Sequence, residues 1–464
     1  MTLAAQAPGT RRPSTAALLA TRATCGESAA VVGEIEQLGH DGWLGQQLDP
    51  AGIDDSALEL KLAAYPWLGM KLHPLMTSGQ DVLDLGEQFK GLRLLRAVES
   101  KRQLLERLLL FWEDHFNVSI GRVHRFVDDA TVWRPFAMGR FGDLLRAVST
   151  STSMVTYLGN QMNHVGAVNE NLAREILELH TLGVTGPYTE DDVREFTRVL
   201  TGWNYVQNGN SPAFGDPVFR PSLHDWTPKT VLGFQFDGTG GEQELLTILD
   251  HLANHPSTIR FVVGKLARFF LGPHPPAQVT ARAEAAWAAS GGEMRVVLQA
   301  LLSRSSFEQV LHRGATRFRR PFEWLSWTLR ATGQPVPAPH DALDLLRSVG
   351  QAPFEWGPPN GFPDDRDSWN GLVASRWAVA ASFARPNGAP WGHSAPDLLT
   401  LLQGRPRAQW VASLSELSGG GHVSASDRLH LYRYVTSLPA TMDDRDALGE
   451  ILELFLSCPS AQTH

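Results

Sequence analysis

Hydrophobic residues recur at three- and four-residue spacing along most of this chain, and this periodicity constrains the fold more than any other feature. In residues 101–116 one such helix face is marked by Leu104, Leu105, Leu108, Leu109 and Trp112. The same pattern is found in residues 144–158, 169–182, 189–203, 245–252, 258–271 and 294–302. The sequence therefore predicts an all-α protein in which helix exceeds half of all residues.

Two long stretches lack this periodicity. Residues 204–243 contain many glycine, proline and asparagine residues, and residues 350–370 are similar but shorter. Within the first stretch, residues 230–236 are the best candidate for a strand, so we expect at most a short β-hairpin. Irregular segments of this length are uncommon in compact domains and are often functional, although surface excursions with local packing are an equal alternative.

No linker or internal repeat divides the chain. Its 464 residues are 43% hydrophobic, which is enough for one large core. We therefore expect a large multi-helix single domain at residues 15–460, preceded by a disordered tail at residues 1–14. Leu108, Trp112, Leu172, Ile176 and Leu179 should be buried in its core.

The bulk composition argues against several classes of function. The net charge is −8 and no basic stripe is present, so a nucleic-acid partner is not expected. The two cysteines, Cys25 and Cys458, form neither a metal knuckle nor a redox pair. No run of about 20 apolar residues is present to span a membrane. Arg11 and Arg12 are followed by too short an apolar stretch for an export signal, so we expect a cytoplasmic protein.

The most distinctive segment is residues 169–184, with the sequence NENLAREILELHTLGV, followed by YTEDDV at 188–193 and LTGW at 200–203. Other motifs occur around it in order: Arg22-Ala23-Thr24, Phe111-Trp112, His115-Phe116, His224-Asp225, Pro321-Phe322-Glu323 and Pro359-Asn360-Gly361. Together they resemble a bacterial family called domain of unknown function 1800, and the resemblance covers about residues 15–460.

The resemblance carries little functional information. It implies a domain that is often exported and often encoded beside a sulfatase-like companion, which is the one partner it indicates, and it brings no agreed activity. This chain departs from the pattern in two respects. No signal peptide is recognised, and Gly159-Asn160 stands where the family often has Asp-Asn.

A helical projection of residues 169–182 separates an apolar face from a charged one. Glu170, Arg174 and Glu178 lie at i, i+4 and i+8, and Glu175 lies at the boundary of the apolar face. One interpretation is a solvated face with ion pairs. The other is a carboxylate site in which Arg174 and Glu178 accompany Glu175, whose pKa would be raised as general acid–base catalysis requires.

Polar and aromatic residues beside this helix are candidates for ligand binding. Amide side chains could bond a polyhydroxylated ligand, and flat aromatic rings suit sugars, although tryptophans of a helical protein are more often core residues. The candidate ligand-binding residues are Asn169, Glu170, Asn171, Trp203 and Trp369.

Histidines offer a second chemistry. His115 and His224 are candidate ligands for a divalent transition metal, although no diagnostic metal spacing such as H-E-x-x-H is present. His115 continues an apolar helix face and is equally explained as a core residue. His224 lies beside Asp225 in a long loop, where the carboxylate could orient the imidazole as a base or ligand.

Three functions remain open at this point. The first is an acid–base hydrolase of carbohydrate or another cell-envelope polymer. The second is a metal-dependent enzyme that uses histidine and carboxylate. The third is a non-catalytic binding or scaffold protein that works with a sulfatase-like partner. We further expect both long irregular segments to meet over the central helix, so that residues 169–178, His224–Asp225 and residues 359–369 line one concavity.

Overall fold

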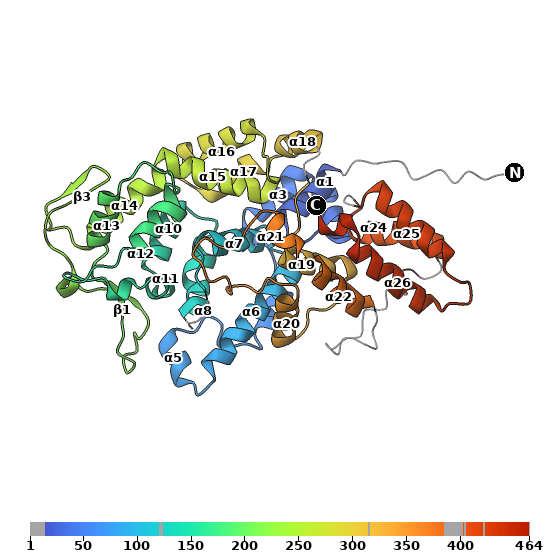
Figure 1. Cartoon of the computed structure of the whole chain (residues 1–464), viewed down its shortest axis with the longest axis horizontal. Helices are drawn as coiled ribbons and strands as arrows, with labels where there is room; N and C mark the ends of the chain where they lie inside the picture. Colours follow the sequence, from blue (N-terminus) through green and yellow to red (C-terminus); the bar gives the residue numbers. More distant parts are fainter. Residues whose placement is uncertain are drawn as a thin grey trace.

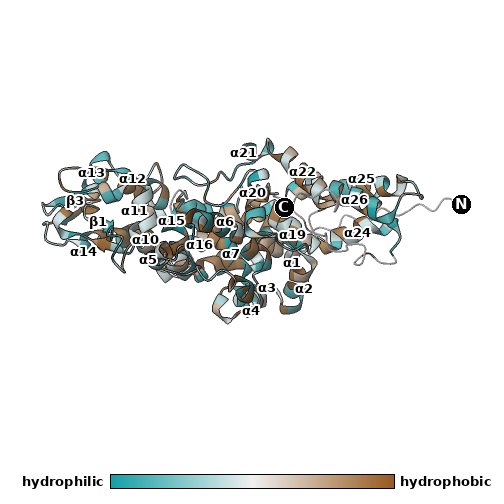
Figure 2. Ribbon diagram, turned by 90° about the horizontal axis from the view of Figure 1, so that it is seen from below, coloured by the Kyte–Doolittle hydropathy of each residue, from teal (hydrophilic) through white to brown (hydrophobic). Residues whose placement is uncertain are grey.

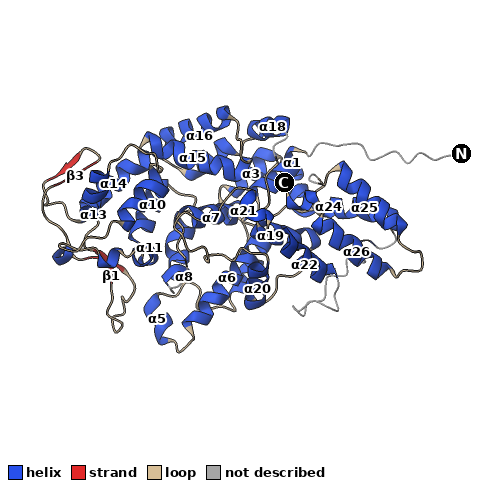
Figure 3. Ribbon diagram, in the orientation of Figure 1, coloured by secondary structure: helices blue, strands red, loops and turns tan. Residues whose placement is uncertain are grey.

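Helices account for 64% of the residues that the computed structural model describes, which are 14–119, 124–313, 316–384, 402, 405–420 and 423–463. This confirms the predicted all-α class (Figure 3). Most of the expected N-terminal tail, residues 1–13, lies outside the described residues. Ser14 is described, and its hydroxyl caps the first helix by accepting a hydrogen bond from the Ala17 amide at 3.1 Å.

The first seven helices build the middle of the molecule around α7, which is seen near the centre of Figure 1. They are α1 (Thr15–Ala23), α2 (Ala29–Leu38), α3 (His40–Gln47), α4 (Ser56–Leu62), α5 (Leu72–Thr77), α6 (Val82–Glu99) and α7 (Gln103–His115). The next helices lead toward one end: α8 (His124–Asp128), α9 (Arg134–Phe136), α10 (Phe141–Thr150), α11 (Thr152–Tyr157), α12 (Asn171–Glu175) and α13 (Glu190–Val199).

The chain then returns and continues to the opposite end, where α24, α25 and α26 lie (Figure 1). The helices that run back to the middle are α14 (Glu242–Asn254), α15 (Pro256–Leu271), α16 (Ala277–Ser290), α17 (Met294–Leu301), α18 (Arg304–Arg313) and α19 (Pro321–Thr332). The remaining helices are α20 (Pro339–Ser348), α21 (Asp367–Asn370), α22 (Val373–Ala384), α24 (Arg407–Leu417), α25 (Ala425–Ser437) and α26 (Asp444–Ser457).

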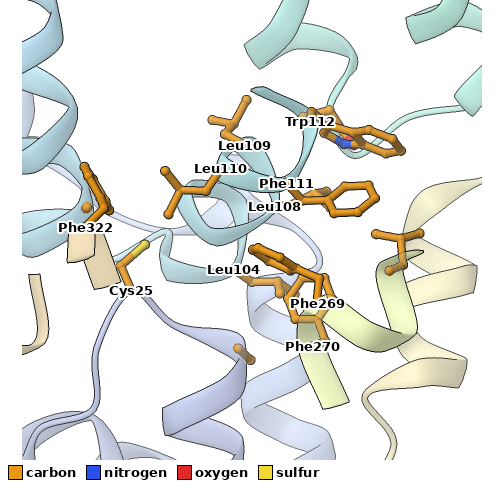
Figure 4. Close-up of a cluster of buried hydrophobic side chains, with 14 of the residues drawn as sticks. Cys25, Leu104, Leu108, Leu109, Leu110, Phe111, Trp112, Phe269, Phe270 and Phe322 are labelled. Atoms are coloured by element: carbon orange, nitrogen blue, oxygen red, sulfur yellow. The ribbon is translucent and has the colours of Figure 1, made fainter. Parts of the chain in front are cut away.

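Helix α7 is buried on nearly all sides, as its hydrophobic sequence predicts. Leu108 and Trp112 have no exposed surface, and the Trp112 indole donates to the Ala137 carbonyl at 3.0 Å. Phe269 and Phe270 of α15 pack close to it (Figure 4). One hydrophobic cluster extends from Ala16 to Ala461. This continuous core supports a single domain at residues 15–460, which remains a prediction.

The helices agree with the sequence periodicity except in two segments. The helix predicted over residues 189–203 ends at Val199, and Trp203 belongs to a strand instead. Residues 144–158 form two helices rather than one, because the Ser151 hydroxyl accepts a hydrogen bond from the Met154 amide and starts α11 anew. Thr189 and Asp192 form a capping box at the start of α13. Hydrophobic and hydrophilic residues alternate along most helices, each of which buries one face (Figure 2).

The first irregular segment contains more strand than expected. Strands β3 (Lys229–Val231) and β4 (Phe234–Phe236) form the predicted antiparallel hairpin. A second antiparallel pair joins β1 (Trp203–Tyr205) to β2 (Pro217–Phe219), so the expectation of at most one hairpin was too low. Each strand has three residues, which is too short for its alternation to be recognised in the sequence.

Among the described residues, no helix combines the length and the apolar character that a membrane crossing requires.

Candidate functional site

The central helix changes its geometry in the middle of the distinctive sequence block. Helix α12 ends at Glu175, and residues Ile176–Thr181 continue it as a π-helix. The Leu182 amide donates to the Leu177 carbonyl at 2.9 Å, a five-residue step, and the Thr181 hydroxyl donates to the Ile176 carbonyl at 2.6 Å. Single π-turns inside helices are frequent at functional sites.

The π-turn corrects one predicted core residue. Leu172, Ala173, Ile176 and Leu177 are fully buried as expected, but Leu179 is only half-buried. A π-turn advances each residue by a smaller angle than the 100° of an α-helix, so side chains after Ile176 point in directions that the helical projection does not give.

The charged face of the helix is an ion-pair network at the surface. Arg174 lies 3.2 Å from Glu170, 3.3 Å from Glu178 and 2.8 Å from Glu190, measured between nitrogen and carboxylate oxygen. About a third of the Arg174 side chain is exposed. Such pairs contribute little stability individually. This network orders Glu178 and joins the central helix to the first turn of α13.

Glu175 is the exception among these acids. It is half-buried and forms no hydrogen bond or ion pair with any described residue. Burial raises the pKa of Glu175, and the nearby Glu178 carboxylate raises it further, with Arg174 opposing. Tyr157 lies near enough that its own pKa is raised, by burial first and then by the charge of Glu175. Glu175 therefore influences the charge of a residue at the end of α11.

A cavity of about 310 Å³ lies beside α11. Its size is at the lower end of the range for small-ligand sites. The lining combines hydroxyl groups with one guanidinium, from Val118, Ser119, Arg125, Ser153, Thr156, Tyr157 and Gly357. Three of these residues come from α11 and one from α8, so short helices and the second irregular segment form its walls.

The second irregular segment is fastened over this cavity by two polar side chains. The Tyr157 hydroxyl donates to the Gly357 carbonyl at 2.5 Å. The Asn117 amide donates to the carbonyls of Trp356 at 2.9 Å and Pro358 at 2.6 Å. These bonds connect residues 356–358 to the ends of α11 and α7.

The first irregular segment reaches the other end of α11. The Thr152 hydroxyl donates to the Gly215 carbonyl at 2.5 Å. Both irregular segments thus contact α11, at Thr152 and at Tyr157. Their meeting over the central helix stays a prediction. Among the described contacts, none joins His224 or Asp225 to Glu175. The prediction that residues 169–178, His224–Asp225 and residues 359–369 line one concavity therefore has no support from these contacts.

His224 belongs to a separate, buried group of charges. Its Nδ1 lies 2.7 Å from the Thr201 carbonyl, and its Nε2 lies 3.5 Å from the Glu244 carboxylate. Lys229 donates to the same carboxylate at 2.9 Å. All three side chains of the Lys229–Glu244–His224 group have no exposed surface. This arrangement fixes the first irregular segment to α14.

Asp225 anchors the same segment to α13. Arg198 donates to its carboxylate at 2.8 Å, and the Thr227 amide does so at 2.9 Å. Burial alone would raise the pKa of Asp225, but hydrogen bonds from Arg198 and Thr227 outweigh it and hold the pKa well below its usual range. The catalytic roles predicted for His224 and Asp225 stay predictions, and their contacts supply a structural role.

The predicted ligand-binding residues are not gathered in one place. Asn169 accepts from the Asn171 amide at 3.0 Å and donates to the Gly159 carbonyl at 3.3 Å, so it orders the start of α12. Trp203 packs on Phe219 in the β1–β2 pair. Trp369 is buried, and its indole donates to the Pro363 carbonyl at 2.8 Å. Their ligand-binding role is untested.

His115 lies in a buried basic group with two other side chains. Lys265 donates to its Nδ1 at 3.0 Å, and its Nε2 lies 3.1 Å from the His180 carbonyl. Burial, and then the Lys265 charge, lowers the pKa of His115 well below its usual value, and burial lowers that of His180 to about 3. Burial also lowers the pKa of Lys265 to about 8.

This group bears on the metal prediction. An ammonium beside His115 repels a metal cation and takes up the nitrogen that a metal would need. His115 and His224 have separate sets of partners, and no group of three or more histidine, cysteine, aspartate or glutamate side chains suited to a metal occurs among the described residues. Their role as metal ligands stays a prediction without support.

The two cysteines are free thiols with little reactivity. Burial raises the pKa of both Cys25 and Cys458 to about 12. A thiolate, which is the reactive form, is therefore disfavoured at both positions.

Sequence reasoning missed Arg125, Tyr157 and Lys265. Arg125 and Tyr157 lie outside the distinctive block at residues 169–203, and only tertiary contacts bring them to the cavity. Lys265 has a sequence signal, since it lies four residues after Phe261 within an apolar helix, where a lysine is uncommon.

Comparison with curated proteins and with solved structures gave no match. A family model described as "Protein of unknown function (DUF1800)" matches residues 18–463. This match spans nearly all of the helical elements described above and includes Glu175, α11 and both irregular segments. The chain therefore belongs to the DUF1800 family.

Proposed function

We propose that this protein is a hydrolase in which Glu175 acts as the general acid at the cavity beside α11. The carrying observation is that Glu175 is half-buried without a bonding partner among the described residues, while its charge raises the pKa of Tyr157, a residue of the cavity wall. A carboxyl group with a raised pKa retains its proton closer to neutrality, as a general acid requires.

The two neighbouring glutamates have different environments. Glu178 is ion-paired with Arg174 at 3.3 Å, whereas Glu175 lacks such a pair. Two carboxyl groups in unlike environments, one paired with a cation and the other not, are the arrangement that acid–base hydrolysis uses. In the proposed reaction Glu175 gives its proton to the leaving oxygen as the bond to that oxygen breaks. Water adds to the other fragment and returns a proton to Glu175, so the reaction balances.

The size and polarity of the cavity indicate the kind of substrate. About 310 Å³ accommodates a small molecule or a single unit of a longer chain. The Ser119 hydroxyl can donate and accept hydrogen bonds with a polyhydroxylated ligand, and the Thr156 hydroxyl, which donates to the Thr152 carbonyl, can accept one. We therefore retain carbohydrate, or one unit of another cell-envelope polymer, as the substrate class.

An activity screen tests the proposal. The full chain is incubated with 4-nitrophenyl glycosides and 4-nitrophenyl esters, and released nitrophenolate is measured by absorbance. The proposal expects hydrolysis of at least one compound, with a loss of about a hundredfold or more in Glu175→Gln. Glu190→Gln, which changes an exposed acid of the same network, should keep full activity. Equal activity of wild type and Glu175→Gln, or no turnover of any compound, would refute the role of Glu175.

A further inference from the structure

Arg125 forms part of the cavity wall and is almost completely buried, with 1% of its surface exposed. Its guanidinium lies between two aromatic rings, 3.8 Å from the centre of Trp133 and 4.6 Å from the centre of Phe354. Contact with two rings restricts the orientation of the guanidinium, whose N–H groups all lie along its edge.

That edge is not used by the protein. Neither Nη1 nor Nη2 of Arg125 has a hydrogen-bond partner among the described residues. The nearest carboxylate is that of Asp129, 3.9 Å from Nη1, which is beyond hydrogen-bond distance. A buried guanidinium without hydrogen bonds is costly to the folded state, so its retention beside a cavity indicates a partner other than the described residues.

The acids around Arg125 also interact with other groups, although Oδ1 of Asp129 and Oε1 of Glu113 form no hydrogen bond with any described residue. Asp129 accepts from Arg134 at 2.9 Å, and Glu113 lies 2.9 Å from Arg93. Asp128 accepts from the Ser153 amide at 2.9 Å. Burial also raises the pKa of Asp128 to about 6. The charge of Arg125 is therefore only partly balanced by these carboxylates.

Phe354 is held over the guanidinium by an unusual backbone. Its φ angle is +63°, which is uncommon for a residue other than glycine, and its ring also stacks on Phe89 at 5.3 Å. Backbone strain of this kind costs on the order of 1–3 kcal/mol and is concentrated at functional sites. Here the strained residue belongs to the irregular segment that closes the cavity, and it orients Arg125.

We propose that the cavity binds an oxyanion group of the phosphate, sulfate or carboxylate type, with the edge of Arg125 as its charged anchor. A guanidinium edge matches two oxygens of such a group. The hydroxyl of Ser119, whose hydrogen can rotate, lies on the same wall and adds a further donor. The substrate of the proposed hydrolase then carries an anionic substituent; this last step, unlike the site itself, rests on the proposed function.

Calorimetric titration of the full chain with inorganic phosphate, sodium sulfate and sodium acetate tests the site, with ionic strength held constant by sodium chloride. The proposal expects one binding event per chain for at least one of these anions, and the strongest binder identifies the type of oxyanion. Arg125→Lys keeps the charge but loses the two-pronged edge, and should weaken binding at least tenfold. Arg146→Lys, an exposed arginine away from the cavity, is the matched control and should bind as wild type does.

A second variant covers the case in which Arg125→Lys fails to fold. Ser119→Ala removes one hydroxyl from the cavity wall, and should weaken anion binding about threefold to tenfold. No binding of any of the three anions, or affinities unchanged in both cavity variants, would overturn the site.

Glu175→Gln separates this site from the proposed hydrolysis. Anion binding should persist in Glu175→Gln even though activity is lost. If Arg125 governs anion binding while Glu175→Gln remains active, the hydrolase proposal fails and the anion site stands.

Discussion

The ammonium group of Lys265 lies 3.0 Å from Nδ1 of His115, inside a cluster that also contains the aromatic rings of Phe111, Phe116 and Phe261. The lysine donates this hydrogen bond, which assigns the remaining ring proton of a neutral His115 to Nε2 and directs it to the His180 carbonyl. The position of one buried cation thereby fixes the tautomer of its neighbour.

This pair predicts a pH-dependent stability. Burial lowers the pKa of Lys265 from 10.5 to about 8. Between about pH 8 and 10.5 the unfolded chain therefore binds more protons at this position than the folded chain, and the free energy of unfolding gains from rising pH. Lys265→Met lacks this gain. Its free energy of unfolding, relative to that of wild type, should therefore fall by about 2–3 kcal/mol between pH 7 and pH 10.5.

Urea denaturation at the two pH values measures this change. Lys71→Met, at an exposed lysine paired with Asp216, serves as the control and should differ from wild type by the same amount at both pH values. A constant difference between Lys265→Met and wild type would contradict the lowered pKa of Lys265.

Glu175→Gln should make the protein slightly more stable at neutral pH. Because the pKa of Glu175 is raised in the folded state, the stability that this group contributes is full below the unfolded value near 4.5 and is lost as pH rises through the folded value. The neutral glutamine avoids this loss. We expect a gain of about 0.5 kcal/mol at pH 7, small because the group is half-exposed, and no gain at pH 4. Thermal melts at both pH values measure it, and destabilisation at pH 7 would count against an unpaired acid.

Glu323 should be among the least tolerant positions in the chain. Its buried carboxylate lies 2.6 Å from Arg107 and 2.8 Å from Arg317. Glu323→Gln removes the carboxylate that these two buried guanidinium groups share and should cost about 3–5 kcal/mol. Denaturant unfolding measures the loss. Glu308→Gln, at an exposed acid paired with Arg304, should change stability far less, and equal effects of the two variants would be inconsistent with this account.

Gly361 should resist substitution in the segment that closes the cavity. Its φ is +73°, and a Cβ atom there would overlap the Asp114 carbonyl oxygen. Gly361→Ala should therefore cost about 2 kcal/mol or more and loosen the closing segment. Gly357 is the matched control, because a Cβ there meets no atom within 4 Å. Thermal melts of both alanine variants compare them directly, and similar melting temperatures would contradict the steric argument.

Hydrophobic periodicity predicts the fold, but it predicts the candidate site only in part. Trp112 and Leu172 are buried as predicted, because hydrophobic spacing reports directly which helix face meets the core. Glu175 was placed at the edge of the apolar face, and it is half-buried. Leu179 was misplaced because a π-turn leaves no mark in the hydrophobic pattern.

The cavity could not be predicted from the sequence. Arg125 and Tyr157 come from different helices, and Gly357 comes from an irregular segment 200 residues after Tyr157. Their proximity depends on how the short helices pack, which local spacing does not encode. The sequence predicts a functional role for His224 because it lies beside an acid in a long loop. Its partners Thr201 and Glu244 are also distant in sequence.

The π-turn at Ile176–Thr181 has a consequence for insertions and deletions in this helix. A π-turn is equivalent to one residue added to an α-helix, so removing one residue there would restore regular α-helical hydrogen bonding. Removing one residue before Glu175 instead would turn every earlier side chain by about 100° relative to the later ones. The first deletion abolishes the local widening and keeps the flanking faces aligned, whereas the second would rotate Leu172 out of the core. We therefore expect the length of the segment before Glu175 to vary less than the length of the π-turn.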